Sequence, residues 1–167
     1  DTPAEITDKP NAPALAVSGG AIVFDDVHFA YDAERQILKG VSFDIKPGHT
    51  LAVVGPSGAG KSTIARLLYR FYDVIGGRVT IDDQDLRDVT QSSLRSSIGI
   101  VPQDTVLFND SIGYNIGYGR EGANQAEIEE AARGASIHGF IESLPDQYAA
   151  KVGERGLKLS GGEKQRV

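Results

Sequence analysis

The sequence of 167 residues contains no cysteine, no methionine and no tryptophan. Without cysteine, the chain can form neither a disulfide framework nor a thiolate metal site. Without methionine, the sequence as given has no initiating residue. We therefore expect it to be a piece of a longer chain.

Long apolar runs and clusters of basic residues are also missing. No stretch approaches the roughly 20 consecutive apolar residues that cross a bilayer as a helix, and no signal peptide is visible. The formal net charge is −6, and a nucleic-acid surface usually needs a basic patch. We therefore expect no nucleic-acid partner.

A glycine-rich loop is the most informative motif that is present. Residues 55–63 read Gly-Pro-Ser-Gly-Ala-Gly-Lys-Ser-Thr, a complete match to the phosphate-loop pattern G-x-x-x-x-G-K-[ST]. The apolar run 51–54 before the loop predicts a buried strand. Apolar residues at helical spacing after the loop predict a helix: Ile64, Leu67, Leu68 and Phe71. Strand, loop and helix together predict a nucleoside triphosphate site, whereas the simpler alternative is a glycine turn that happens to precede Lys-Ser.

The chemistry of the motif assigns a role to each part of the loop. Glycines allow backbone N–H groups to approach phosphate oxygens closely. Lys61 would place its ammonium on the β- and γ-phosphates, the Ser62 hydroxyl would bind Mg²⁺, and Thr63 would reach the α-phosphate. The residues expected to bind the nucleotide are Gly55, Pro56, Ser57, Gly58, Ala59, Gly60, Lys61, Ser62 and Thr63.

The remaining pattern predicts an α/β architecture with one domain over residues 21–167. Residues 1–20, rich in proline and glycine, predict a linker with no stable structure of its own. Strands are expected at 22–24, 27–31, 41–45, 78–81 and 98–101, and helices from about residue 124 and over 137–144.

A second motif lies near the end of the sequence, where residues 159–163 read Leu-Ser-Gly-Gly-Glu. Alone, Ser160 followed by Glu163 is a capping box that opens a helix. Downstream of a complete phosphate loop, however, the motif resembles the signature of the ATP-binding cassette (ABC) ATPases. Two further residues occur in the matching order. Tyr31 resembles the aromatic residue that stacks on adenine, and Gln103 resembles the hinge-loop glutamine that senses Mg²⁺ and the attacking water.

The resemblance covers residues 21–167 and implies a phosphate-loop NTPase core. This core has an N-terminal antiparallel β-subdomain and a helical subdomain, with further strands after Val167. ATP and Mg²⁺ are the implied cofactors, and a second nucleotide-binding domain, arranged head to tail, is the implied partner. Residues given a role by the resemblance are Lys61, Gln103 and Ser160 as catalytic groups, Ser62 and Gln103 as metal ligands, and Ser160, Gly161 and Gly162 as contacts to the partner's ATP. The family's Mg²⁺-binding Asp, its base Glu and its switch His would lie beyond these residues, so we expect the 167-residue chain alone to be inactive as an ATPase.

Residues 152–156 (Val-Gly-Glu-Arg-Gly) resemble the segment with which ABC exporters contact their membrane domain. This resemblance implies a transmembrane domain as a second partner, with residues 1–20 as the linker from it. It also implies a membrane-associated location, with the domain on the cytoplasmic or mitochondrial matrix face. The runs 101–108 and 157–159 are similar to the iron–sulfur and heavy-metal class of exporters, which moves glutathione-linked sulfur or metal compounds.

Two other functions fit parts of the sequence. A soluble ABC ATPase that acts on nucleic acid or ribosomes shares the two motifs, but residues 152–156 and the acidic charge disfavour it. An unrelated phosphate-loop GTPase or kinase shares only the first motif. A GTPase would also need an Asn-Lys-x-Asp guanine-binding run, which is absent from the sequence.

Overall fold

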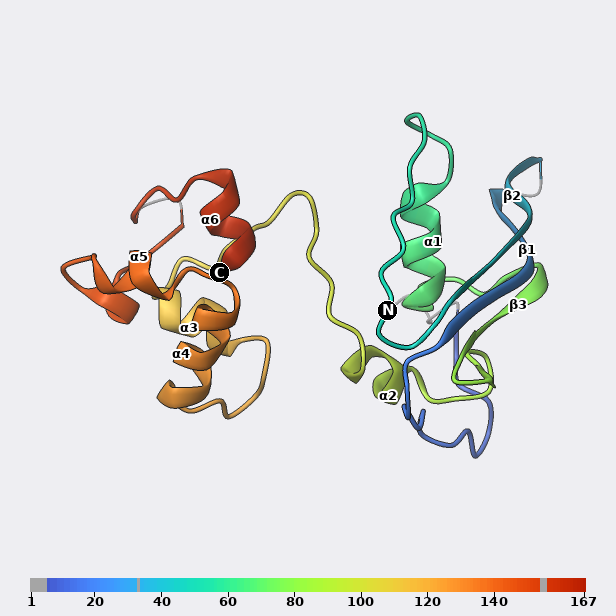
Figure 1. Ribbon diagram of the computed structural model, residues 1–167, viewed down its shortest axis with the longest axis horizontal. Helices are drawn as coiled ribbons and strands as arrows, with labels where there is room; N and C mark the ends of the chain where they lie inside the picture. Colours follow the sequence, from blue (N-terminus) through green and yellow to red (C-terminus); the bar gives the residue numbers. More distant parts are fainter. Residues whose placement is uncertain (1–5, 33, 154–155) are drawn as a thin grey trace. The chain divides into compact units, whose positions relative to one another are not determined.

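The computed structural model describes residues 6–32, 34–153 and 156–167. The chain divides into two compact units, residues 1–99 and 100–167. Figure 1 shows the elements of each unit in chain order.

An antiparallel sheet of four strands organises the first unit, in the order β2-β1-β3-β4. The strands are β1 (Ile22–Asp32), β2 (Arg35–Ile45), β3 (Gly76–Ile81) and β4 (Gln84–Asp85). This sheet confirms the predicted N-terminal antiparallel β-subdomain. The two predicted strands at 22–24 and 27–31 are one long strand, because β1 continues through register shifts between Phe24 and Val27.

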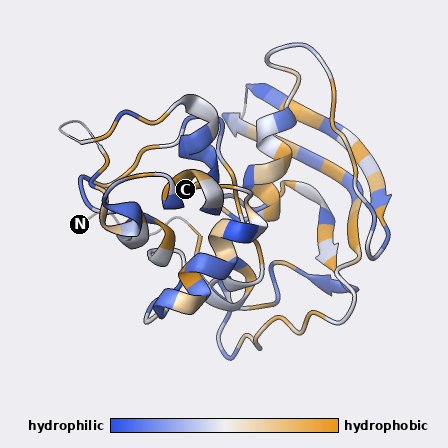
Figure 2. Ribbon diagram, turned by 60° about the vertical axis from the view of Figure 1, so that its left-hand side comes forward, coloured by the Kyte–Doolittle hydropathy of each residue, from blue (hydrophilic) through white to orange (hydrophobic). Residues whose placement is uncertain are grey.

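The core of the first unit lies between the sheet and the helices α1 (Lys61–Leu68) and α2 (Gln91–Ser96). Figure 2 shows apolar and polar residues alternating along the strands, as expected for a sheet with one face buried. Leu67 of α1 and Leu94 of α2 pack into the same buried cluster as the strand residues. The strand residues in that cluster are Phe24, Val27, Phe29, Leu38, Val79 and Ile81. The predicted helix after the glycine loop is confirmed, although Phe71 lies beyond its end and is exposed.

Two predicted strands are absent from the described structure. Residues 51–54 have no regular secondary structure, and Val54 is 87% exposed. Residues 98–101 are likewise not a strand, and Val101 is 74% exposed. A strand needs a hydrogen-bonded neighbour, and no described segment forms a ladder with either run. The prediction of these strands from apolar composition alone was therefore wrong for this structure.

The N-terminal segment 6–20 has no helix or strand, but it is held firmly on the first unit. Leu15 is buried in the core, and its backbone N–H donates to Ser93 Oγ at 2.8 Å. The buried side chain of Arg70 donates to the carbonyl oxygen of Thr7 and lies 3.5 Å from the Asp8 carboxylate. Composition predicted the lack of regular structure, but it did not predict this docking.

Asp82 anchors the end of the N-terminal segment. Its carboxylate accepts backbone N–H groups from Ser18, Gly19, Gly20 and Ala21 at 2.7–2.9 Å. These hydrogen bonds, that of Gly20 first, hold the pKa of Asp82 well below its usual range. Asp82 itself has a left-handed backbone with φ of 47°, which aspartate and asparagine tolerate better than most residues.

The second unit is helical, in agreement with the predicted helical subdomain. It contains α3 (Ile112–Gly117), α4 (Gln125–Gly134), α5 (His138–Glu142), the 3₁₀ helix η1 (Gln147–Ala149) and α6 (Gly161–Arg166). Its buried core comprises Ile112, Ala132, Ile137, Ile141, Tyr148, Ala150, Val152 and Leu159. The helix predicted from about residue 124 is α4, which begins after the Asn124 cap. The helix predicted at 137–144 is α5, which is shorter at both ends. Among the described residues, no helix is both long and apolar enough to cross a membrane.

We expect Asp82→Asn to lower the melting temperature. Asparagine tolerates the left-handed turn, but it replaces the charged carboxylate, whose two oxygens accept the backbone N–H groups, with a neutral amide that has one acceptor oxygen. A carboxyl with a lowered folded-state pKa stabilises the fold above its unfolded pKa, about 3.9, and loses that contribution as the pH falls toward the folded value. Thermal unfolding between pH 7 and pH 3 should therefore show a smaller acid-induced loss for the variant than for the wild type. Asp83→Asn removes the same charge from the same turn and is the control. Equal effects of the two substitutions would contradict the anchoring role of Asp82.

Candidate nucleotide-binding site

Two left-handed glycines shape the loop between residue 55 and α1. Gly58 has φ of 81° and Gly60 has φ of 91°, a region that other residues rarely adopt. Gly60 is also packed tightly: a Cβ atom at this position would lie 2.8 Å from Leu38 Cδ2 and 3.3 Å from Ile37 Cγ2. The loop therefore approaches β2 as closely as only glycine permits, and α1 starts at the next residue.

Lys61 turns back into the loop. Its ammonium donates hydrogen bonds to the carbonyl oxygens of Gly55 and Pro56, both at 2.7 Å. The cation is thus held inside the curve of the loop, at the N-terminal end of α1. The first turn of α1, a fully described helix, carries no acidic residue that would compete for this positive field. An anion that enters the loop would meet a helix terminus and an ammonium together.

Ser62 and Thr63 differ in their surroundings. Ser62 is exposed, so its hydroxyl is accessible to a ligand or ion at the loop. Thr63 is only 5% exposed, and its Oγ1 lies 3.2 Å from the hydroxyl oxygen of Tyr31. This contact joins the start of α1 to the end of β1.

Tyr31 is held by aromatic neighbours beside the loop. Its ring is nearly perpendicular to the rings of Phe29 and Tyr72, with centroids 4.9 Å and 5.1 Å away. Arg66 donates to its hydroxyl at 3.0 Å, and the guanidinium carbon lies 5.9 Å from the ring centroid. Tyr31 remains 40% exposed. Arg66 was not identified from the sequence as a neighbour of Tyr31. Its position on α1, three residues after Thr63, places it on the same side of the helix as the other group that contacts the Tyr31 hydroxyl.

The second motif forms the start of α6, in the second unit. Ser160 is the N-cap, its Oγ accepts the N–H of Glu163, and the Glu163 carboxylate accepts the N–H of Ser160 at 2.7 Å. This last hydrogen bond is the main cause that lowers the pKa of Glu163. The capping box is therefore confirmed. Gly161 and Gly162 are exposed, and a Cβ atom at either position would have open space around it.

Gln103 is exposed and lies in the same unit as α6. The side chain of Gln165, on α6, donates to the carbonyl oxygen of Gln103 at 3.1 Å. The structure therefore brings the Gln103 segment and the Ser160 helix together. Gln165 lies two residues after the 159–163 motif and in the same helix, but the sequence did not predict its contact with Gln103, because a single glutamine on a helix is usually a solvated side chain.

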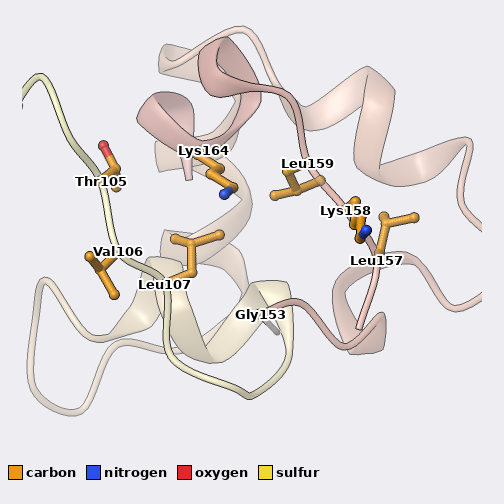
Figure 3. A pocket seen from close by; sticks show the side chains of 8 residues that line it. All are labelled: Thr105, Val106, Leu107, Gly153, Leu157, Lys158, Leu159 and Lys164. Carbon is orange, nitrogen blue, oxygen red and sulfur yellow. The ribbon is translucent and has the colours of Figure 1, made fainter. Parts of the chain in front are cut away.

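A cavity of about 400 Å³ separates the stretch that follows Gln103 from the stretch that precedes Ser160. Figure 3 shows Thr105, Val106 and Leu107 on one side and Leu157, Lys158 and Leu159 on the other, with Lys164 of α6 between them. The cavity walls are mainly apolar and carry two ammonium groups.

The segment 152–156, predicted to contact a membrane domain, is only partly described, because residues 154 and 155 lie outside the described residues. Val152 is buried, and it forms a parallel bridge with Leu157. Gly153 has φ of 110°, and a Cβ atom there would lie 2.0 Å from Asn109 Oδ1. Glycine is required at this position for the chain to turn.

The predicted site residues thus form two groups. Tyr31, the glycine loop and the start of α1 meet in the first unit, and Gln103 and the Ser160 helix meet in the second. A family model described as ABC transporter matches residues 38–167, which is most of the chain. The chain belongs to the ABC transporter family.

The relatives of this ABC domain agree with the exporter class suggested by its motifs. It is 63% identical to an ATM1-type heavy metal exporter of Novosphingobium aromaticivorans, over the whole chain and 28% of the exporter's length. It is 60% identical to human ATP-binding cassette sub-family B member 6, over 98% of the chain and 19% of that protein. The structure of a bacterial Atm1-family ABC exporter with ATP bound matches with a TM-score of 0.92 and 63% identity, over 97% of the chain and 28% of that structure. The ABC domain therefore spans less than a third of each of these relatives. The alternative of a nucleic-acid-directed ATPase finds no support among them.

We expect Gly60→Ala to destabilise the ABC domain by about 1–3 kcal/mol, because the new methyl group overlaps Leu38 in a backbone conformation unsuited to alanine. Gly58→Ala is the matched control: its φ is equally left-handed, but a Cβ atom there meets nothing within 4 Å. Chemical denaturation of the two variants measures the difference. A Gly58→Ala variant as unstable as Gly60→Ala would show that close packing against β2 is unimportant.

Proposed function

We propose that the ABC domain binds Mg·ATP with its triphosphate in the loop of residues 55–63. The main support for this proposal is the position of the Lys61 ammonium. It is held inside the loop by two carbonyl oxygens, and the loop turns through left-handed glycines directly before α1. Its two carbonyl partners are neutral, and phosphate oxygens offer a stronger, charge-assisted replacement. On binding, the ammonium would exchange these carbonyls for the β- and γ-phosphates.

Different residues would bind the adenine base and the Mg²⁺ ion. Tyr31, exposed beside the loop, would stack on adenine through its ring. Ser62 and Gln103 would hold Mg²⁺ through a hydroxyl and an amide oxygen, which suit a hard cation. A bound Mg²⁺ supplies charge neutralisation of the phosphates during hydrolysis. Gln103 would also orient the attacking water through its amide.

A second copy, or a related domain, would complete the site in a head-to-tail dimer. Ser160, Gly161 and Gly162 would contact the partner's ATP with their hydroxyl and backbone groups. This role is supported by their exposure and by the open space beside both glycines, which lets a phosphate approach the backbone closely. ATP binding would close the dimer, and hydrolysis would release it.

The longer relatives support a role as the ATP-hydrolysing part of an exporter. We infer a transmembrane domain in the same transporter, with residues 1–20 connecting to it. The ABC domain would lie on the cytoplasmic or mitochondrial matrix face of the membrane. The cargo would be a heavy metal or a glutathione-linked sulfur or metal compound. Pairing with strands elsewhere in such a protein would also account for the exposed apolar side chains of residues 51–54 and 100–101.

The first test of this function is Lys61→Ala, measured as the equilibrium affinity for Mg·ATP. Loss of a charge-assisted contact of about 1.5–3 kcal/mol predicts at least about tenfold weaker binding. Lys39→Ala removes an exposed lysine from β2 and should bind ATP like the wild type. Unchanged affinity in Lys61→Ala would overturn the assignment of the loop.

The head-to-tail dimer is tested by mixing two defective variants of the full-length protein. Lys61→Ala damages the loop of its own copy, whereas Ser160→Arg damages the site contributed to the partner. A mixed dimer contains one composite site free of both changes, so ATP-dependent association should appear in the mixture and in neither variant alone. Association of either variant alone, or none in the mixture, would contradict a shared site.

A further inference from the structure

Arg66 engages Tyr31 closely at the candidate site, although no motif of the sequence assigns it a role. We infer that Arg66 is a positioning residue for the nucleotide base: it fixes the Tyr31 ring beside the phosphate loop through the tyrosine hydroxyl. This inference deepens the proposed function and rests on it. It adds a determinant of adenine affinity that lies on α1 and outside the phosphate-loop motif.

The hydrogen bonds around the Tyr31 hydroxyl have a defined direction. A guanidinium has only donors, so Arg66 Nη1 donates and the Tyr31 oxygen accepts, at 3.0 Å. The phenolic hydrogen is then available for Thr63 Oγ1, at 3.2 Å. Thr63 is buried at the start of α1, and Arg66 follows it by three residues, on the same side of the helix. The hydroxyl is therefore attached to α1 at two points, one turn apart.

The ring itself is restricted by its neighbours. Phe29 and Tyr72 meet it at 88° and 86°, so two perpendicular rings limit its rotation. The tether to α1 restricts the remaining freedom, because the hydroxyl end cannot swing away without breaking both hydrogen bonds. Tyr31 nevertheless stays 40% exposed, which leaves ring surface for a base.

A ring that is ordered before binding loses less conformational entropy when a base stacks on it, and preorganisation of this kind increases affinity. The attraction between Arg66 and Tyr31 also raises the pKa of the guanidinium, in keeping with a favourable contact. Since Tyr31 bonds to Thr63, the base-stacking ring and the phosphate-binding helix are kept in one fixed relation.

The experiment compares Mg·ATP with inorganic triphosphate, which has no base, as ligands of the full-length protein. Arg66→Gln and Tyr31→Phe are made singly and together, and Arg78→Gln, which removes an exposed arginine from β3, is the charge control. Both single variants should weaken Mg·ATP binding about three- to tenfold, the scale expected for one side chain that must be ordered on binding. Inorganic triphosphate should bind all variants, including Arg78→Gln, like the wild type.

The double variant distinguishes positioning from a direct contact. If Arg66 acts through the tyrosine hydroxyl, Arg66→Gln adds nothing to Tyr31→Phe, so the double variant binds Mg·ATP like either single one. Additive losses, or an equal loss for inorganic triphosphate, would overturn the inference, because Arg66 would then contact the phosphates itself. Unchanged ATP affinity in both single variants would also overturn it while leaving the proposed function intact. A wild type that binds no ATP would refute the proposed function and this inference together.

Discussion

The close approach of Gly60 to β2 constrains the phosphate loop, because it leaves no room for a Cβ atom beside Leu38. Gly60 has a left-handed backbone, and α1 begins at the next residue. Because α1 begins at Lys61, the ammonium lies at the helix terminus, within reach of the carbonyl oxygens of the loop. The same start places Thr63 against the end of β1. The cation, the helix end and the aromatic residue therefore lie together directly after this glycine.

The ammonium of Lys61 is ordered by groups of the loop itself. Lys61 is bonded to two neutral carbonyl groups, which order the ammonium without neutralising its charge. A carboxylate in that position would compete with a phosphate, whereas a carbonyl is easily exchanged for one. The Tyr31 hydroxyl is also held from two sides, since it accepts from the Arg66 guanidinium and lies within hydrogen-bond distance of Thr63 Oγ1, while the ring stays 40% exposed.

In the second unit, a capping box and one side-chain hydrogen bond order the motif of residues 159–163. The Ser160–Glu163 capping box satisfies the first N–H groups of α6 within the helix, and Gln165 connects that helix to the Gln103 segment. Two segments separated by more than fifty residues in the sequence are thus joined by one side chain. The hydrogen bond from Gln165 is therefore the direct link between the two segments, and a cavity separates the stretches beside it.

Local sequence determined the glycine loop, the helix after it, the Ser160–Glu163 capping box and the strands that pair with their neighbours in the chain. Each of these depends on residues close together, so spacing and residue type were sufficient to predict them. The strands predicted at 51–54 and 98–101 failed because pairing depends on a partner elsewhere, which apolar composition does not reveal. The contacts of Arg66, Gln165 and Asp82 were likewise decided by tertiary structure, because each side chain bonds to a residue distant in the sequence. Chemical type made them capable of these contacts, and only the fold supplied the partner.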